Sequence, residues 1–245
     1  MKHIGIICEG PTDYIILTWV IDKIIGDANK YVQLQPDNDL TGKYGNGWKG
    51  VLKWCYDNAS NRKQLMKDIQ PYLDFLVIQM DGDVSRKEKS AHCWCPTTQC
   101  EHKGFKNPLE CDITPQGREA CPVILPCKDH MDSIDGYMDH LKSLITQTLQ
   151  DTEDTCITIP CDSTEAWIVA AYDEIPEIEY VVDPWTKIIA HGKSYHNIRV
   201  PGKKKHVRIF EKFAPVVCEN WNKVTRLCKS ARDFEDSLRL LTKTI

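Results

Sequence analysis

Two short apolar segments, each followed at once by acidic residues, constrain the fold of this chain more than any other feature. Residues 4–8 are followed by Glu9, and residues 75–80 are followed by Asp81 and Asp83. Apolar runs of this length, rich in isoleucine and valine, are typical of strands buried on both faces of a parallel sheet. Because open parallel sheets bind ligands beyond the carboxyl ends of their strands, we expect these three acids to lie together at one edge.

The segments around these two runs predict alternating helices and strands. After the first strand, in chain order, we predict a helix at 12–25, a strand at 31–34, helical structure at 48–69 and the strand at 75–80. Helical periodicity returns from residue 131 to residue 149, and a strand at 156–160 and a helix that starts at Glu165 follow. This order favours an α/β fold, with a mostly parallel sheet of about four strands and helices on both faces.

One segment interrupts the alternation and divides the chain into three parts. Residues 1–83 and 129–173 form the predicted α/β domain, and residues 84–128 form a cysteine-rich insertion. Residues 174–245 are predicted to contain a basic loop and then two closing helices, near 219–229 and 231–243.

Composition limits the class of protein. The net charge is −4 at pH 7, so a surface that binds nucleic acid must be local. No apolar run reaches the roughly 18 residues of a membrane helix, and the N-terminus enters a strand without a signal-peptide pattern. We therefore expect a soluble, cytoplasmic protein that does not associate with membranes.

Half of the 12 cysteines are crowded into the insertion. In a cytosolic chain such a cluster favours metal binding over a disulfide framework, and a metal can replace the core that a short polar segment lacks. We predict a structural Zn²⁺ held by Cys95, Cys100, Cys121 and Cys127, with Cys93, Cys111 and His102 as spare candidates. The alternative is a loop with free thiols, or with disulfides formed on oxidation. The six scattered cysteines are expected to be small core residues.

The acidic motifs resemble those of a known family. Glu9-Gly10-x-x-Asp13 after one strand and Asp81-x-Asp83 after a later one resemble the TOPRIM fold, which topoisomerases, bacterial primases and the OLD-type nucleases of phage-defence systems share. The resemblance implies that Glu9, Asp81 and Asp83 bind Mg²⁺ (or Mn²⁺) and act in phosphodiester chemistry. Two further segments, 159–167 and 231–238, resemble stand-alone TOPRIM-like proteins of bacteria and phage.

The residue types suit this chemistry without the family name. Mg²⁺ prefers oxygen ligands from one or two carboxylates and substrate phosphates. We expect Asp81 and Asp83 to share one face of an extended chain and to hold the metal, with Glu9 as general base or as ligand of a second metal. Asp13 and Glu165 are second-tier candidates, since either acid is also explained by its place near a helix N-terminus. Either acidic motif alone would more often be a simple turn.

A basic run in the C-terminal part is the candidate nucleic-acid contact. It contains Lys203, Lys204, Lys205 and Arg208, which would bind backbone phosphate in DNA or RNA; the alternative is a solvated loop. No phosphate-binding loop of the Gly-x4-Gly-Lys type appears, so an ATPase partner, which the resemblance suggests, would be a separate protein.

The sequence therefore predicts a Mg²⁺-dependent nuclease and leaves two alternatives open. The first is a catalytically inactive, zinc-stabilised scaffold that binds a partner. The second is a phosphotransferase or phosphohydrolase acting on small substrates, which needs the same metal site. The choice between DNA and RNA and the formation of a homo-oligomer also stay open.

Overall fold

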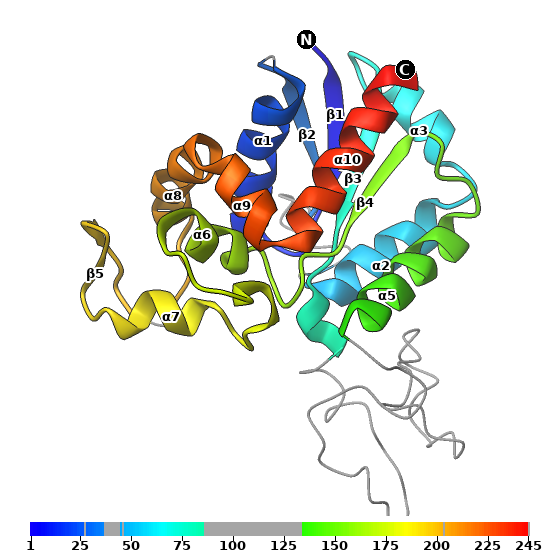
Figure 1. Ribbon diagram of the computed structural model, residues 1–245. Helices are drawn as coiled ribbons and strands as arrows, with labels where there is room; N and C mark the ends of the chain where they lie inside the picture. The colour runs from blue at the N-terminus through cyan, green and yellow to red at the C-terminus, as the bar shows by residue number, and fades with distance from the viewer. Residues whose placement is uncertain (27, 37–44, 46, 86–133, 203, 245) are drawn as a thin grey trace, which may run out of the picture.

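The protein is described here by a computed structural model that covers residues 1–26, 28–36, 45, 47–85, 134–202 and 204–244. Its centre is a parallel sheet with the strand order β2-β1-β3-β4 (Figure 1). The four strands are β1 (His3–Ile7), β2 (Lys30–Gln35), β3 (Phe75–Gln79) and β4 (Thr155–Thr158). The predicted α/β class and parallel sheet are confirmed.

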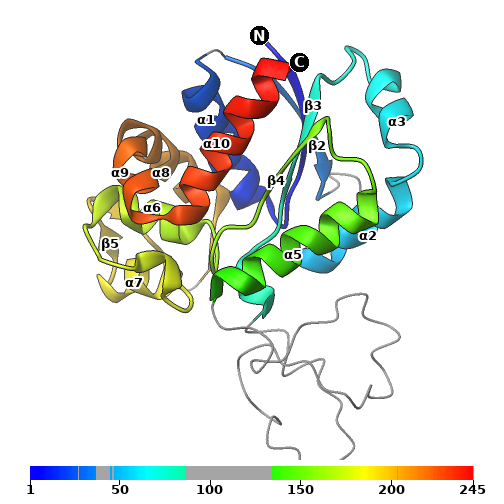
Figure 2. The same ribbon diagram turned by 45° about the vertical axis from the view of Figure 1, so that its right-hand side comes forward.

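Helices cover both faces of the sheet (Figure 2). One face packs on α2 (Trp48–Asn58) and α5 (Ile134–Leu149), with α3 (Arg62–Asp68) beside them. The other face packs on α1 (Pro11–Ile25), α6 (Glu165–Tyr172), α8 (Val207–Glu219), α9 (Trp221–Leu227) and α10 (Lys229–Thr244). The remaining elements are η1 (Gly82–Ser85), η4 (Ile178–Tyr180), α7 (Trp185–Ala190), β5 (Ser194–Tyr195) and β6 (Ile198–Arg199).

The strand residues alternate between the two faces, as strand geometry requires. Ile4 and Ile6 of β1 belong to the core that contains α1 and the C-terminal helices, whereas Ile7 belongs to the core that contains α2 and α5. Every residue of β3 and β4 is buried. The two central strands, β1 and β3, are apolar almost throughout because both of their faces are covered.

The C-terminal part differs from its prediction. Residues 207–219 form α8, whereas we expected a basic loop that includes residues 203–208 and no helix before residue 219. Pro215 lies inside this helix, and proline is a poor signal for a helix interior. Burial of Phe210 and Phe213 against α1 and α6 stabilises it. Residues 84–128 lie almost entirely outside the described parts of the chain.

Among the described residues, none of the helices combines the length and the apolar character needed to cross a membrane.

Candidate functional site

The strand order places Glu9 and Asp81 beside the point of the sheet where the chain connections run to opposite sides of β1. The chain leaves β1 for β2 on one side of the sheet, and β3 lies on the other side of β1. Ligands of open α/β sheets bind outside the carboxyl ends of the strands at such a switch point. Glu9 follows β1 and Asp81 follows β3, so both lie at this edge, which is the lower edge of the sheet in Figure 1.

Three side chains join the two strand ends in a hydrogen-bond network. The backbone N–H of Asp81 donates to Oε1 of Glu9 at 2.7 Å. The backbone N–H of Glu9 donates to Oε1 of Gln79 at 3.2 Å, and Nε2 of Gln79 donates to Oδ1 of Asp81 at 2.7 Å. Gln79 is fully buried and fixes both acids, a role that the sequence reading missed. The feature of the sequence that could have indicated this role is Gln79 itself, an amide side chain at the end of an otherwise apolar strand.

The second-tier acids also belong to this edge. Asp13 in the first turn of α1 is buried and accepts a hydrogen bond from Oγ1 of Thr164 at 2.6 Å. Thr164 occupies the N-cap position of α6, but its hydroxyl bonds to Asp13 rather than to its own helix. Glu165 is 1% exposed, and its Oε1 lies 2.7 Å from Nζ of Lys205. Its Oε2 is buried and has no hydrogen-bond partner within the described chain.

Mutual repulsion and burial favour protonated forms of these carboxyl groups. Burial and the charges of Asp83 and Asp13 raise the pKa of Glu9 well above its usual value. Burial, followed by the charges of Asp13 and Glu9, does the same to the pKa of Asp81. Burial and the charge of Glu165 raise the pKa of Asp13 to about 7. Perturbed acids that share one edge are a typical sign of a functional site.

Lys205 supplies positive charge to this group of acids. We expected it to contact backbone phosphate, but in the structure its ammonium pairs with Glu165. Burial alone would lower the pKa of Lys205, and the Glu165 carboxylate outweighs that effect, so the pKa is raised. The charges of Asp81 and Asp13 also raise the pKa of Lys205. The ammonium thus lies where negative charge accumulates.

The geometry around Asp83 corrects one expectation. Strand β3 ends at Gln79, and residues 82–85 form the short 3₁₀ helix η1. The side-chain alternation of an extended chain therefore does not set the positions of Asp81 and Asp83. Our expectation that the two residues share one face of an extended chain was wrong. Asp83 is still close enough to Glu9 to raise its pKa.

Gly82 is required for close packing. A Cβ at this position would lie 2.3 Å from Sδ of Met138 and 2.9 Å from the carbonyl oxygen of Pro160. The N–H of Gly82 also donates to that carbonyl at 2.9 Å. The glycine thus lets α5 and the end of β4 approach the acidic turn.

The chemistry of these donors suits a divalent cation. A cation would relieve the repulsion that raises the carboxyl pKa values, and it would satisfy the buried Oε2 of Glu165. In the part of the chain that the structure describes, however, no group of three or more acidic, histidine or cysteine side chains is arranged to hold a metal ion. Glu9, Asp13, Asp81 and Glu165 each direct an oxygen to an internal partner instead.

The other predicted sites are only partly described. The zinc candidates Cys93, Cys95, Cys100, His102, Cys111, Cys121 and Cys127 lie outside the described residues, as does Lys203. Lys204 and Arg208 are exposed. Of the scattered cysteines, Cys8, Cys55, Cys156, Cys161 and Cys228 are buried, as expected for core residues, whereas Cys218 is half-buried.

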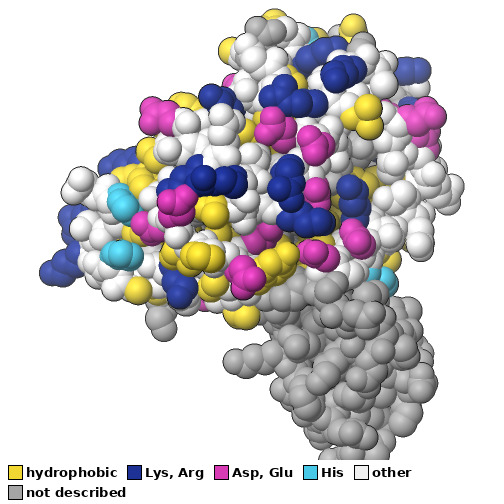
Figure 3. Space-filling model, in the orientation of Figure 1, with side chains coloured by type: hydrophobic (Ala, Val, Ile, Leu, Met, Phe, Trp, Pro, Cys, Tyr) yellow, Lys and Arg dark blue, Asp and Glu magenta, His cyan; other side chains and the backbone are white. Residues whose placement is uncertain are grey.

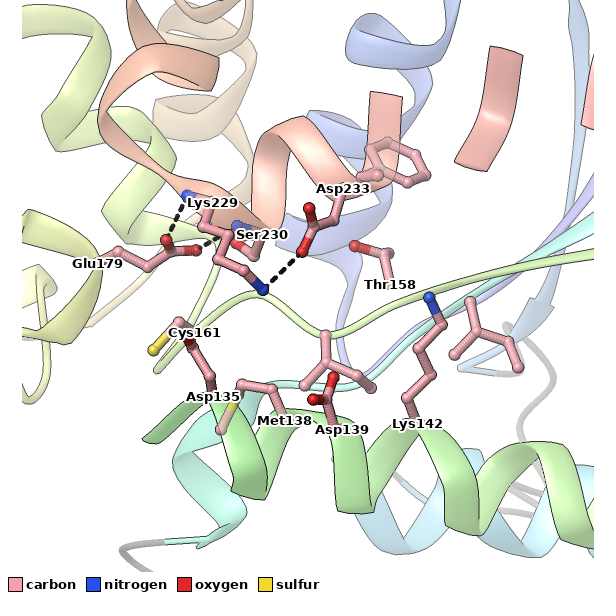
Figure 4. Close-up of a pocket in the computed structure, with 13 residues that line it drawn as sticks. Asp135, Met138, Asp139, Lys142, Thr158, Cys161, Glu179, Lys229, Ser230 and Asp233 are labelled. Atoms are coloured by element: carbon pink, nitrogen blue, oxygen red, sulfur yellow. Dashed lines mark hydrogen bonds and ion pairs between the residues drawn. The ribbon is translucent and has the colours of Figure 1, made fainter. Parts of the chain in front are cut away.

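A cavity of about 60 Å³ lies on the outer side of β4, between α5 and α10 (Figure 4). The Glu179 carboxylate accepts hydrogen bonds from the backbone N–H groups of Lys229 and Ser230, at 2.5 and 2.8 Å. Nζ of Lys229 pairs with Asp233 at 3.0 Å. A carboxylate in this place satisfies the first N–H groups of α10. We interpret the cavity as a junction that holds α10 beside β4, separate from the acidic edge.

No protein-family model, curated protein or solved structure matches this chain. The function is therefore inferred from the geometry and the chemistry of the acidic edge.

Proposed function

We propose that the protein is a Mg²⁺-dependent, TOPRIM-like nuclease that cleaves phosphodiester bonds in DNA or RNA. The observation that carries the proposal is the meeting of Glu9 and Asp81 at the switch point of a parallel sheet, joined by a 2.7 Å hydrogen bond. Asp13, Glu165 and Lys205 surround them. Five carboxyl groups and one ammonium at a substrate-binding edge suit the handling of a phosphate group.

Each side chain has a role that follows from its surroundings. Asp81 and Asp83 would hold a divalent ion, which supplies charge stabilisation for the phosphate oxygens. Burial and the neighbouring acids raise the pKa of Glu9; once a bound cation offsets those charges, its carboxylate would act as the general base that accepts a proton from the attacking water. Lys205 would place its ammonium against a non-bridging phosphate oxygen, where negative charge increases in the transition state. Gln79 would hold Glu9 and Asp81 in register.

The insertion and the partners remain part of the proposal. A structural Zn²⁺ on Cys95, Cys100, Cys121 and Cys127 would stabilise the insertion, which starts directly after the acidic turn at Asp83. Metal analysis of the purified protein tests this, with about one Zn²⁺ per chain expected. A role in phage defence beside a separate ATPase is suggested by the family resemblance alone.

A nuclease assay tests the proposal. The protein is incubated with mixed labelled DNA and RNA, single- and double-stranded, with Mg²⁺, with Mn²⁺ and without added metal. We expect cleavage of at least one substrate only with metal. The same products without metal, or no product under any condition, would contradict the proposal.

One observation favours the inactive scaffold as a second candidate. In the described residues the acids are bonded to internal partners, and Lys205 already supplies a positive charge. A scaffold of this kind would not bind Mn²⁺ at the edge, whereas the nuclease would. Calorimetric titration with Mn²⁺ on wild type and on a Glu9→Gln variant separates the two.

A further inference from the structure

A second positively charged surface lies beside the acidic edge. Between Asp183 and Glu211 the sequence contains no acidic residue, although the whole chain has a net charge of −4. Helix α7 and the β5–β6 hairpin, residues 185–199, form the first part of this segment, and we call this part the basic arm. Its Lys187, Lys193 and Arg199 are all exposed.

One neighbouring acid, Asp173, pairs with His196 of the basic arm, but the lysine and arginine side chains of the arm are not paired with an acid within the described structure. Some exposed cations elsewhere on the surface pair with acids, as Lys63 does with Asp151 and Lys229 with Asp233. Within the described chain, no salt bridge to an acid involves the three cations of the arm. Figure 3 shows lysine, arginine and histidine side chains, with acidic side chains between them, at the end of the molecule where α7 and β5 lie. This surface therefore attracts polyanions.

The hairpin is held firmly against the protein body. The turn residues His196 and Asn197 both have positive φ, at 43° and 66°. A two-residue hairpin turn of type I′ requires positive φ at both of its central residues. The hydroxyl of Tyr195 is 2.5 Å from one oxygen of Asp173, and Nε2 of His196 is 2.8 Å from the other. The His196 ring also stacks on Tyr172. The arm thus presents its cations from a fixed frame, which reduces the entropy lost on binding.

The chain connects the basic arm directly to the acidic edge. Arg199 precedes Lys205 by six positions, and Lys205 pairs with Glu165 at the edge. Six residues span at most roughly 20 Å. The large hydrophobic side chains that are exposed in the described structure all lie outside residues 185–199, so the surface is charged rather than apolar. A partner that binds this surface would therefore be anionic, and an extended one could reach the acidic edge.

We propose that the basic arm binds the sugar–phosphate backbone of a nucleic-acid substrate beside the bond that is cleaved. This inference rests on the proposed function for its substrate. At a rise of about 3.4 Å per base pair, a reach of roughly 20 Å corresponds to about six base pairs. In the hairpin Arg199 pairs with Ser194, and Lys193, one residue before β5, lies opposite Val200, whose N–H donates to the Lys193 carbonyl oxygen. The two cations therefore extend from opposite faces of the hairpin, and each would contact a separate phosphate.

An equilibrium binding measurement tests this without requiring cleavage. The full chain, in buffer without added Mg²⁺ or Mn²⁺, is titrated into a labelled DNA duplex and into an RNA duplex of the same sequence. The Lys193→Ala/Arg199→Ala variant is compared with a Lys67→Ala/Lys243→Ala control, which removes the same charge from α3 and from the last turn of α10. Unchanged circular dichroism verifies that both variants fold.

We expect the arm variant to bind at least one duplex about 10- to 100-fold more weakly at physiological salt, with a salt slope smaller by about two. The control should bind as wild type does. The inference would be overturned if the arm variant and the control variant bound nucleic acid with the same affinity, whether unchanged or weakened, or if the wild-type protein did not bind. If binding depends on the basic arm but the nuclease assay shows no cleavage, the inference about the arm stands and only the proposed nuclease activity is contradicted.

Discussion

Glu9 and Asp81 are separated by 72 positions in the chain, yet the N–H of Asp81 donates a 2.7 Å hydrogen bond to Oε1 of Glu9. The contact exists because β1 and β3 are adjacent parallel strands that end at the same level, with Ile7 opposite Ile78. It brings two carboxyl groups with raised pKa values to the place where such sheets bind ligands. The predictions below test what this pair and its neighbours do.

Replacing Glu9 with Gln should abolish cleavage and leave the fold intact. The amide oxygen still accepts from the Asp81 N–H, but the side chain no longer accepts a proton or carries a negative charge. We expect the rate to fall by at least about 100-fold and the melting temperature to change little. A Glu153→Gln variant, in the exposed loop before β4, is the control. Full activity of the Glu9→Gln variant would remove Glu9 from the mechanism.

Stability should depend on pH and on divalent metal together. The pKa of Asp13 rises from 3.8 to about 7, so between these values the folded protein binds more protons than the unfolded chain. Without metal, the contribution of Asp13 to stability is therefore lost as pH rises from about 4 to about 7. Mg²⁺ must displace those protons, so its stabilising effect should increase over the same range. Thermal unfolding at several pH values, with and without Mg²⁺, measures this.

An Asp13→Asn variant is the matched control for that experiment. It should lose the part of the pH dependence that lies between about pH 4 and about pH 7 while keeping a hydrogen bond to Thr164. A metal effect that is the same at every pH in wild type would speak against proton displacement at this edge.

Lys205→Ala should lower both the stability and the nuclease activity of the protein. Lys204→Ala should leave stability unchanged and weaken the affinity for nucleic acid by no more than a few-fold. Removing Lys205 leaves the buried Glu165 carboxylate without its ammonium. Since the Lys205 side chain is 39% exposed, we expect a loss of about 1–2 kcal/mol rather than the larger loss of a fully buried pair. Chemical denaturation of both variants gives the comparison. Equal stabilities would mean that the ion pair contributes nothing.

Gly82→Ala should distort the acidic turn. The added Cβ would meet Met138 Sδ and the Pro160 carbonyl, so the chain must shift at a cost of about 1–3 kcal/mol. Combining it with Met138→Ala relieves the side-chain clash but not the clash with the carbonyl. We therefore expect the double variant to recover little activity. Wild-type activity in Gly82→Ala would show that the positions of Asp81 and Asp83 are not critical.

The sequence predicted the sheet because its strands are apolar on both faces and end in acids, and those signals are local. It also predicted that Glu9 and Asp81 would meet, since parallel strands bring their carboxyl ends together. It did not predict that Lys205 pairs with Glu165, because no local pattern links positions that lie 40 residues apart in the chain. The 3₁₀ turn at Asp83 was missed for a related reason, since packing against Met138 and Pro160 determines it.

Crystals soaked in Mn²⁺ test the central claim most directly, since the ion reports its own position by anomalous scattering. We predict a peak about 2.1 Å from carboxylate oxygens of both Asp81 and Asp83, on the side of the edge where Glu9 lies. An acidic edge without a peak, with Glu9 still bonded to the Asp81 N–H and manganese bound elsewhere or not at all, would contradict a metal-dependent nuclease.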